Sequence, residues 1–268
     1  MELCSQSIRI HRKLDEIPTL ESTKVRLFTA LEDEDADLKD IERIIEKDPA
    51  MAAKVIKLAN AAFYRREAQV ESIHDAILTV GFDMVKCITV SMAVMHTFGT
   101  STTVANSLWR HSVAVGVLAF GLGKDKPEKE TLLSGGLLHD LGRMVLLYIE
   151  PDVYAPLFDD NYPDIDLEQE IFSMDHAAIG EIIAKRWHFP PEVVNIIRNH
   201  HRPNNRISAL IRLVDCVVSE HDNKLLENPD IREDIDRIKH FLGSEYKSVV
   251  NDVLSKYNQG SALIEDFI

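Results

Sequence analysis

Hydrophobic residues recur at helical spacing along almost all of this 268-residue chain. No stretch alternates between apolar and polar residues for long enough to make a sheet. Leu38, Ile41, Ile44 and Ile45 show the pattern, because they fall on one face of a helix. Glycine, proline and capping residues divide the pattern into many helices. The sequence therefore predicts an all-α, multi-helix bundle that is long enough to bury a substantial core.

The interruptions in this pattern predict a fold of two lobes and a tail. Gly99-Thr100-Ser101-Thr102 is the best candidate boundary. We expect an N-terminal helical lobe over residues 1–100, a second helical lobe over 101–222 and a charged helical tail over 223–268. In the second lobe, the expected helices cover about 104–122, 129–149, 167–172, 176–187, 191–201 and 207–219.

Composition narrows the class of protein. Hydrophobic residues make up 45% and charged residues 28%, as is ordinary for a soluble globular protein. No run reaches the roughly 18 apolar residues that suggest a membrane span, and no secretory signal is visible. Cys4, Cys87 and Cys216 form no CxxC motif, which fits a reducing compartment. We therefore expect a cytoplasmic protein with no membrane segment. The net charge of −14 argues against general nucleic-acid binding.

The most informative stretch is residues 135–143, which reads Gly-Gly-Leu-Leu-His-Asp-Leu-Gly-Arg. It places His139 and Asp140 inside an expected apolar helix, where burying ionisable groups without partners is costly. Adjacent side chains on a helix point about 100° apart, so both can approach one metal centre. An imidazole nitrogen and a carboxylate oxygen suit a borderline or hard divalent ion. A pair that is satisfied within the core is the alternative.

Other histidines and an aspartate favour a shared site. His111 falls in the middle of one expected helix, and His176 begins another. His200 and His201 end a later helix, and Asp215 lies within the next one. Each alone is more often structural. Together they match the way in which helix bundles build di-metal sites from inward carboxylates and imidazoles. The candidate ligands are His111, His139, Asp140, His176, His200, His201 and Asp215.

The order His111, His139-Asp140, Asp215 is similar to the H…HD…D pattern of the HD superfamily of metal-dependent phosphohydrolases. The additional histidines resemble the extra ligands of its two-metal branch, which includes the HD-GYP cyclic-di-GMP phosphodiesterases. The chain departs from HD-GYP proteins after the double histidine, where it reads His-His-Arg-Pro-Asn-Asn without a Gly-Tyr-Pro triplet. Arg143 also replaces the lysine that often follows HDxG in catalytic members.

The first lobe points to one branch of this superfamily. Residues 17–20, 44–50, 57–64 and 72–81 resemble the HDOD domain, the "HD-related output domain" of bacterial signalling proteins. The resemblance covers about residues 15–218. It implies an all-helical, two-lobed domain with an HD-like C-terminal lobe. It also implies a regulatory role in signal transduction.

Two functions remain open at this point. The first is a signalling module that binds a partner protein or a small phosphorylated ligand, with a pocket that binds metal or is a polar core. The second is a metal-dependent phosphohydrolase acting on a phosphomonoester, a nucleotide or a cyclic dinucleotide. In that case Asp140 would bridge two ions, and Arg143 would neutralise phosphate charge. The expected cofactor is one or two divalent ions, with Mn, Fe, Mg and Ni as candidates.

Residues 57–66 supply a candidate surface for a partner. Phe63, Tyr64, Arg65 and Arg66 combine aromatic and basic character, which is typical of the cores of interfaces. A helix end packed between the lobes is the alternative.

Overall fold

The computed structural model describes residues 2–17, 38–46, 49–60, 69–82, 102–158, 162–220 and 232–266, with single or paired positions at 84–85, 89, 92, 94 and 97–98. Within these residues the chain forms α- and 3-10 helices and no strand. The predicted all-α class is therefore confirmed.

Among the described residues, the N-terminal part of the chain contributes α1 (Glu2–Asp15), α3 (Leu38–Glu46), α4 (Pro49–Ala59) and α5 (Ile73–Val80). Local signals in the sequence explain their limits. Pro49 occupies the first turn of α4, where a missing N–H costs nothing. The Ser72 hydroxyl accepts a hydrogen bond from the backbone N of Asp75 and caps α5. Gly81, with φ 93°, ends it.

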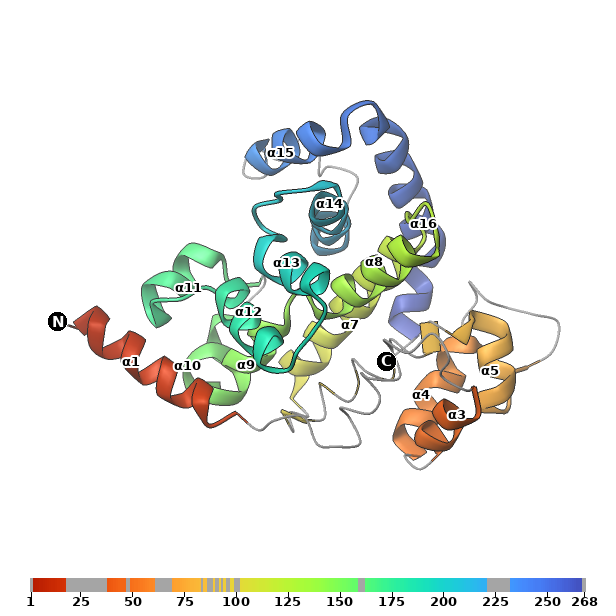
Figure 1. Ribbon diagram of the computed structural model, residues 1–268, viewed down its shortest axis with the longest axis horizontal. Coiled ribbons are helices and arrows are strands. Elements are labelled where there is room, and N and C mark those ends of the chain that lie inside the picture. The colour runs from red at the N-terminus through yellow and green to blue at the C-terminus, as the bar shows by residue number, and fades with distance from the viewer. Residues whose placement is uncertain are drawn as a thin grey trace.

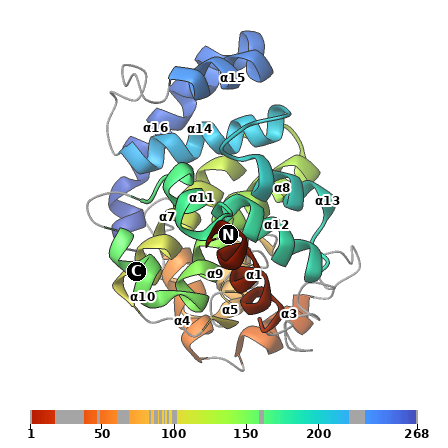
Figure 2. The same ribbon diagram turned by 90° about the vertical axis from the view of Figure 1, so that its left-hand side faces the viewer.

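A larger group of helices follows, here called the larger lobe, and Figure 1 shows it between α1 and α3–α5. Its helices are α7 (Thr103–Phe120), α8 (Lys126–Leu138), α9 (Leu141–Ile149), α10 (Pro151–Tyr154), η2 (Ala155–Leu157), α11 (Ile165–Phe172), α12 (His176–Arg186), α13 (Pro191–Asn199) and α14 (Arg206–Glu220). The tail contributes α15 (Arg232–Leu242), η5 (Gly243–Glu245) and α16 (Tyr246–Asp266). Figure 2 shows α15 beyond α14, on the side away from α9.

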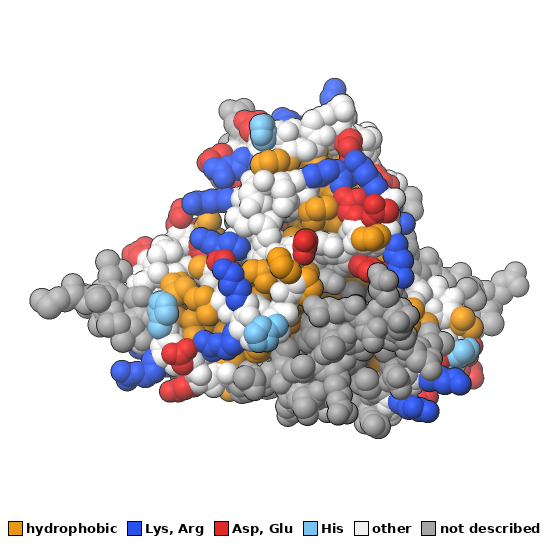
Figure 3. Space-filling model, in the orientation of Figure 1, with side chains coloured by type: hydrophobic (Ala, Val, Ile, Leu, Met, Phe, Trp, Pro, Cys, Tyr) orange, Lys and Arg blue, Asp and Glu red, His pale blue; other side chains and the backbone are white. Residues whose placement is uncertain are grey.

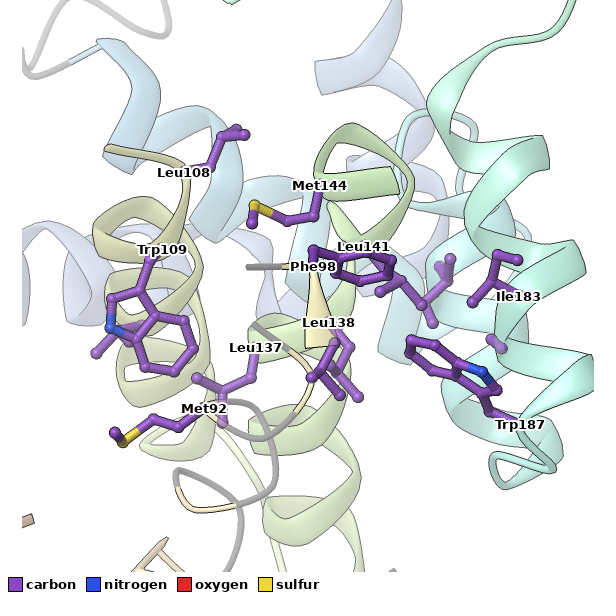
Figure 4. Close-up of a cluster of buried hydrophobic side chains, with 14 of the residues drawn as sticks. Met92, Phe98, Leu108, Trp109, Leu137, Leu138, Leu141, Met144, Ile183 and Trp187 are labelled. Carbon is purple, nitrogen blue, oxygen red and sulfur yellow. The ribbon is translucent and has the colours of Figure 1, made fainter. Parts of the chain in front are cut away.

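Helices α7 and α8 form the centre of the molecule, because each contributes to two apolar clusters. Leu108 and Leu137 belong to a cluster that extends to α9 and α12. Leu118 and Leu132 belong to a second cluster with α14, α15 and α16. Figure 4 shows part of the first cluster, including Trp109, Leu138 and Trp187. The ring of Phe98 stacks on that of Trp187, with centroids 5.7 Å apart. These contacts hold residue 98 against α12.

Helix α1 packs on the larger lobe, on the side opposite α3–α5 (Figure 1). Arg9 and Lys13 pair with the buried carboxylate of Glu150, at 2.6 and 3.0 Å. Arg186 of α12 pairs with Asp15 at 2.9 Å. The start of the chain is thus held by charge contacts to the lobe that contains the site. The predicted lobe boundaries at residues 100 and 222 lie outside the described residues and stay predictions.

Residues 126–149 form a long apolar helical stretch, with a mean hydropathy of 1.3 over an 18-residue window. That window is 89% buried inside the fold. The stretch is therefore core of the larger lobe, although its length and composition alone would allow it to cross a membrane. On the face shown in Figure 3, basic and acidic side chains are interspersed, with groups of hydrophobic side chains between them.

Candidate metal centre

The close crossing of α7 and α8 brings the first two histidines together. A Cβ atom added to Gly136 would lie 2.6 Å from the Cα of Gly116, so neither position tolerates a side chain. This approach sets His111, in the middle of α7, beside His139, which follows the end of α8. Their Nε2 atoms lie 3.3 Å apart. The two glycines therefore set the spacing of this half of the site.

His139 and Asp140 do not lie inside one helix. Helix α8 ends at Leu138 and α9 begins at Leu141, and Asp140 has φ −93° and ψ 19°. The prediction of a single helix over 129–149 was wrong, because apolar periodicity continues through both helices and hides the break. The tertiary structure explains the turn between the two helices. Asp140 makes no capping bond to α9, and its carboxylate faces the histidines instead.

His176 enters the site at the start of α12. Asp175 caps this helix by accepting a hydrogen bond from the backbone N of Ala178 at 2.7 Å. Gly142 of α9 packs directly on the His176 backbone, since a Cβ on Gly142 would lie 1.8 Å from the His176 carbonyl oxygen. This contact leaves Nε2 of His176 3.1 Å from Oδ1 of Asp140.

The remaining predicted ligands come from the end of α13 and from α14. Nε2 of His176 lies 3.2 Å from Nε2 of His200 and 3.0 Å from Nε2 of His201. Oδ1 of Asp215 lies 3.0 Å from Nε2 of His111. The structure thus gathers all seven predicted side chains in one place. Their role as metal ligands stays a prediction.

Asp140 divides these side chains into two groups. Its Oδ2 faces His139 at 3.5 Å and His111 at 4.0 Å, whereas its Oδ1 faces His176 at 3.1 Å and His200 at 3.7 Å. Donor atoms of Asp140, His176, His200 and His201 all lie within 4.8 Å of one another. Those of His111, His139 and Asp140 do so as well.

These spacings suit coordination. Donors at about 2.1 Å from one ion lie about 3.0 Å apart at right angles and about 3.4 Å apart in a tetrahedron. The closest pairs in the two groups, at 3.0 to 3.5 Å, fall in this range. The residues present therefore fit two adjacent divalent ions that share Asp140.

Hydrogen bonds at Nδ1, the ring nitrogen on the side away from the centre, orient three of the histidines. Nδ1 of His139 faces the carbonyl of Gly136 at 2.7 Å, and Nδ1 of His200 faces that of Ile197 at 2.9 Å. Nδ1 of His176 faces a carboxylate oxygen at 2.6 Å. A neutral ring has one N–H, so each donates from Nδ1 and turns the lone pair of Nε2 inward. Two such lone pairs 3.2 Å apart, on His176 and His200, repel each other unless a metal ion lies beside them or His176 takes up a proton.

Burial and neighbouring charges favour neutral histidines and ionised aspartates in the site. Burial lowers the pKa of His139, and it lowers the pKa of His200 and His201 well below the usual value. Burial alone would raise the pKa of Asp140, but Arg143 and His139 hold it well below its usual range. Neutral imidazoles and ionised carboxylates are the forms that bind metal.

Asp215 and His176 complete this pattern. Burial opposes ionisation of Asp215, yet the hydrogen bond from His111 and the charge of Arg212 hold its pKa well below the usual range. His176 behaves differently from the other rings. Burial and Arg143 act to lower its pKa, but Glu168 and Asp140 outweigh them and raise it. Without a metal, His176 is therefore the ring that takes up a proton most readily.

The carboxylate that orients His176 was not predicted from the sequence. Glu168 of α11 is completely buried, and it accepts hydrogen bonds from the backbone N of His176 at 2.7 Å and from the Tyr154 hydroxyl at 2.6 Å. A signal was present, because Glu168 lies four residues before the core residue Phe172 and so on the same helix face. A carboxylate in that position needs a buried partner.

Arg143 connects this carboxylate to the site. Its guanidinium donates to Asp140 at 3.0 Å, to Glu168 at 2.9 Å and to the carbonyl of Pro163 at 2.8 Å, and the side chain is only 5% exposed. Its predicted role toward a bound phosphate stays a prediction. The contacts that the structure shows orient two carboxylates.

Further side chains surround the site. Arg212 donates to Oδ2 of Asp215 at 2.7 Å and also pairs with Asp234 of α15 at 2.5 Å, so the tail helix supports a predicted ligand. The ring of Tyr162 packs against that of His111, with centroids 5.2 Å apart. Neither residue was predicted from the sequence, although Arg212 lies only three residues before Asp215. Tyr162 and His111 are distant in the chain. The predicted partner surface of Phe63, Tyr64, Arg65 and Arg66 lies outside the described residues.

Comparison with known proteins identifies the architecture. A model of the HDOD domain matches residues 17–203. An HDOD domain protein of unknown function from Geobacter sulfurreducens superimposes with a TM-score of 0.76 at 20% identity, covering 98% of this chain and 97% of that one. A "putative phosphohydrolase" from Shewanella amazonensis SB2B gives 0.73 at 21% identity, covering 98% and 99%. These similarities show a shared fold.

A longer protein matches in sequence. An uncharacterized protein of Treponema pallidum is 29% identical over 196 residues. The match spans 70% of this chain but only 38% of the relative.

Proposed function

This chain belongs to the HDOD domain family, and on that premise we propose that it is a signalling module built around a divalent-metal centre. One ion would be held by His111, His139, Asp140 and Asp215, and a second by Asp140, His176, His200 and His201. The mixture of imidazole and carboxylate donors suits borderline ions such as Mn²⁺ and Fe²⁺ better than ions that bind oxygen alone.

One observation supports this proposal above the others. With both rings neutral, the Nε2 atoms of His176 and His200 face each other as acceptors at 3.2 Å, beside an oxygen of Asp140. A polar core without metal would place a donor between acceptors, because buried polar groups are normally paired. Here the neutral rings of His139, His176 and His200 each donate their N–H from Nδ1 to an oxygen on the side away from the centre. The cluster therefore has more inward acceptors than donors, as a cation site requires.

In this proposal the centre serves regulation in the cytoplasm. The module would transmit its state through a signalling partner or through a small phosphorylated ligand. His111, Asp140 and Asp215 are buried, with 5–6% exposure, and His201 is half-buried, so a ligand would approach the centre beside His201. Arg143 and Glu168 would keep Asp140 and His176 in place while the ligand binds.

A metal-dependent phosphohydrolase is the second candidate, and the sharing of Asp140 between two donor groups favours it. Bound ions would polarise a phosphoryl oxygen and lower the pKa of a coordinated water. Other residues of the protein would hold the metal ligands in position. Arg143 holds one oxygen of the bridging carboxylate, and Glu168 orients His176.

A reconstitution experiment tests the proposal and separates the two candidates. Chelator-treated protein would be titrated with Mn²⁺ and with Fe²⁺ under anaerobic conditions in a calorimeter. We expect saturable binding of one or two ions per chain. The loaded protein would then be assayed against phosphomonoesters and cyclic dinucleotides. Turnover would favour the hydrolase, whereas metal without turnover would favour the signalling module. Failure to bind either ion would contradict both.

A further inference from the structure

A small cavity adjoins the metal centre on the side of His201. Its volume is about 80 Å³, and its walls include Asp175, Arg198, Asn199, His201 and Arg202. It lies where the start of α12 meets the end of α13. Because Nε2 of His201 is 3.0 Å from Nε2 of His176, one wall of the cavity belongs to the candidate ligand set. A molecule in the cavity would therefore lie next to the centre.

The size of the cavity restricts what it can hold. One water needs about 10–15 Å³ by the same measure, so the cavity has room for a group of several heavy atoms. It is much smaller than the roughly 300–1,000 Å³ of sites that enclose a drug-sized ligand. A single oxyanion group fits this space, with the rest of its molecule outside in solvent.

Two arginines give the cavity its charge. Arg202 is exposed and, among the residues that the structure describes, makes no ion pair or side-chain hydrogen bond. Arg198 pairs with Asp175 at 3.6 Å and with Glu181 at 3.3 Å. Arg202 is thus available to an incoming anion, whereas Arg198 would contact that anion by sharing or exchanging these carboxylate contacts.

One acidic residue also lines the cavity, and its charge is already engaged. Asp175 accepts the capping hydrogen bond from the backbone N of Ala178 at 2.7 Å and faces Arg198. Its charge is matched by Arg198, and Arg202 leaves a net positive charge. Bound metal ions would increase that positive charge. A guanidinium recognises the oxygens of a phosphoryl group with two parallel hydrogen bonds.

We propose that this cavity is a phosphoryl-binding subsite, in which Arg202 and Arg198 hold the terminal phosphoryl group of a small phosphorylated ligand beside the metal centre. The proposal rests on the proposed function and extends it, because it names the place where the phosphoryl group would bind and the residues that would hold it. The ligand would present one phosphoryl group inward and leave the remainder in solvent.

Calorimetric titration with inorganic phosphate tests the subsite. It would compare the wild-type protein with Arg202→Ala, Arg198→Ala and the control Arg237→Ala, each with Mn²⁺ and after chelation. Arg237 is a matched control, because it is a half-exposed arginine of α15 that pairs with Glu233. We expect Kd for phosphate to rise roughly tenfold in each cavity variant, as loss of a charge-assisted hydrogen bond implies. The control should bind as the wild type does.

The outcomes distinguish the proposed phosphoryl subsite from the proposed metal centre on which it rests. Metal content is measured on the same samples, and neither arginine is a candidate ligand, so metal content should not change. Arginine-dependent phosphate binding by a protein that takes up no metal would support the subsite and contradict the metal centre. Metal binding with phosphate affinity unchanged in Arg202→Ala would contradict the subsite alone. Equal affinity for acetate would also contradict it, because the cavity would then attract any anion.

A second titration identifies the source of the group. Glycerol phosphate binding with the same dependence on Arg202 would indicate a phosphate ester. Binding of inorganic phosphate alone would indicate a sensor of free phosphate. Either result supports the subsite, and binding of neither probe would overturn it.

Discussion

Nδ1 of His176 lies 2.6 Å from Oε2 of Glu168, and both side chains are completely buried. The carboxylate also accepts the backbone N–H of the same histidine at 2.7 Å. The ring is thereby held in the orientation that turns Nε2 toward Asp140. Carboxylate–histidine pairs of this kind orient metal ligands and raise their basicity. Several predictions about the centre depend on this pair and its neighbours.

Glu168→Gln should weaken metal binding without removing a candidate ligand. The amide keeps the size of the side chain but loses the charge that orients His176, and such outer partners typically contribute about 10–100-fold to affinity. Calorimetry with Mn²⁺ measures the change. Glu170→Gln, on the exposed face of the same helix, is the matched control and should bind as the wild type does. Equal affinity in both variants would show that Glu168 has no part in the centre.

Arg143→Ala should destabilise the fold. The change leaves Asp140 and Glu168 as buried carboxylates without their shared partner, and breaking a buried pair costs about 3–5 kcal/mol. Urea denaturation of the metal-free protein measures the free energy of unfolding. Lys185→Ala, which breaks an exposed pair with Glu181, should change it by less than about 1 kcal/mol. If Arg143 served only to contact a phosphate, its removal would leave stability unchanged.

Gly142→Ala should separate α9 from α12. The new Cβ would overlap the His176 carbonyl oxygen, which is backbone and cannot move alone. We expect a loss of stability of about 1–3 kcal/mol and weaker metal binding, because His176 would shift from Asp140. Gly121→Ala is the control, since its Cβ would mainly meet the flexible end of Lys256. Thermal unfolding compares the two. Similar melting temperatures for both variants would contradict the close packing of these helices.

Metal affinity should fall as pH falls through the pKa of His176. Burial and Arg143 act to lower this pKa, but Glu168 and Asp140 raise it above the usual 6.5. In the metal-free protein, the protonated ring adds stability that is complete below its unfolded pKa and lost as pH rises through the raised folded value. Metal must displace that proton, so affinity should drop about tenfold per pH unit below the folded pKa.

Proton release provides the measurement for this prediction. Calorimetry in buffers of different ionisation enthalpy counts the protons that leave when Mn²⁺ binds. We expect release near pH 6.5 that declines toward higher pH. Binding without proton release across this range would mean that His176 is already neutral.

The sequence predicts the class of fold well because local signals define many helices. Pro49, Ser72 and Asp175 mark the starts of helices where the structure has them. The break at His139-Asp140 escaped prediction, since Leu138 and Leu141 continue one apolar pattern across it. The turn directs both polar side chains toward His111 and His176. These contacts are tertiary, so the local sequence does not show them.

The candidate ligands were predictable because each is a polar residue in an apolar helical setting. The contacts of the residues that support them were not, although the helical position of Glu168 indicated that its carboxylate is buried. Glu168 meets His176 eight residues later, but Arg143 meets Glu168 twenty-five residues away, and no local pattern connects them. Docking of α1 on the larger lobe through Glu150 joins residues more than 130 positions apart. Long-range charge pairs of this kind require the structure.

The metal content of the purified protein tests the central claim most directly. Elemental analysis would compare the wild type with the double variant His139→Ala/Asp140→Ala, after loading with Mn²⁺ or Fe²⁺ and removal of excess ion. Circular dichroism would confirm that both remain helical. We expect one or two equivalents of metal in the wild type and a loss of bound metal in the variant. Stoichiometric metal in the folded double variant, or none in the loaded wild type, would contradict a metal centre at this site.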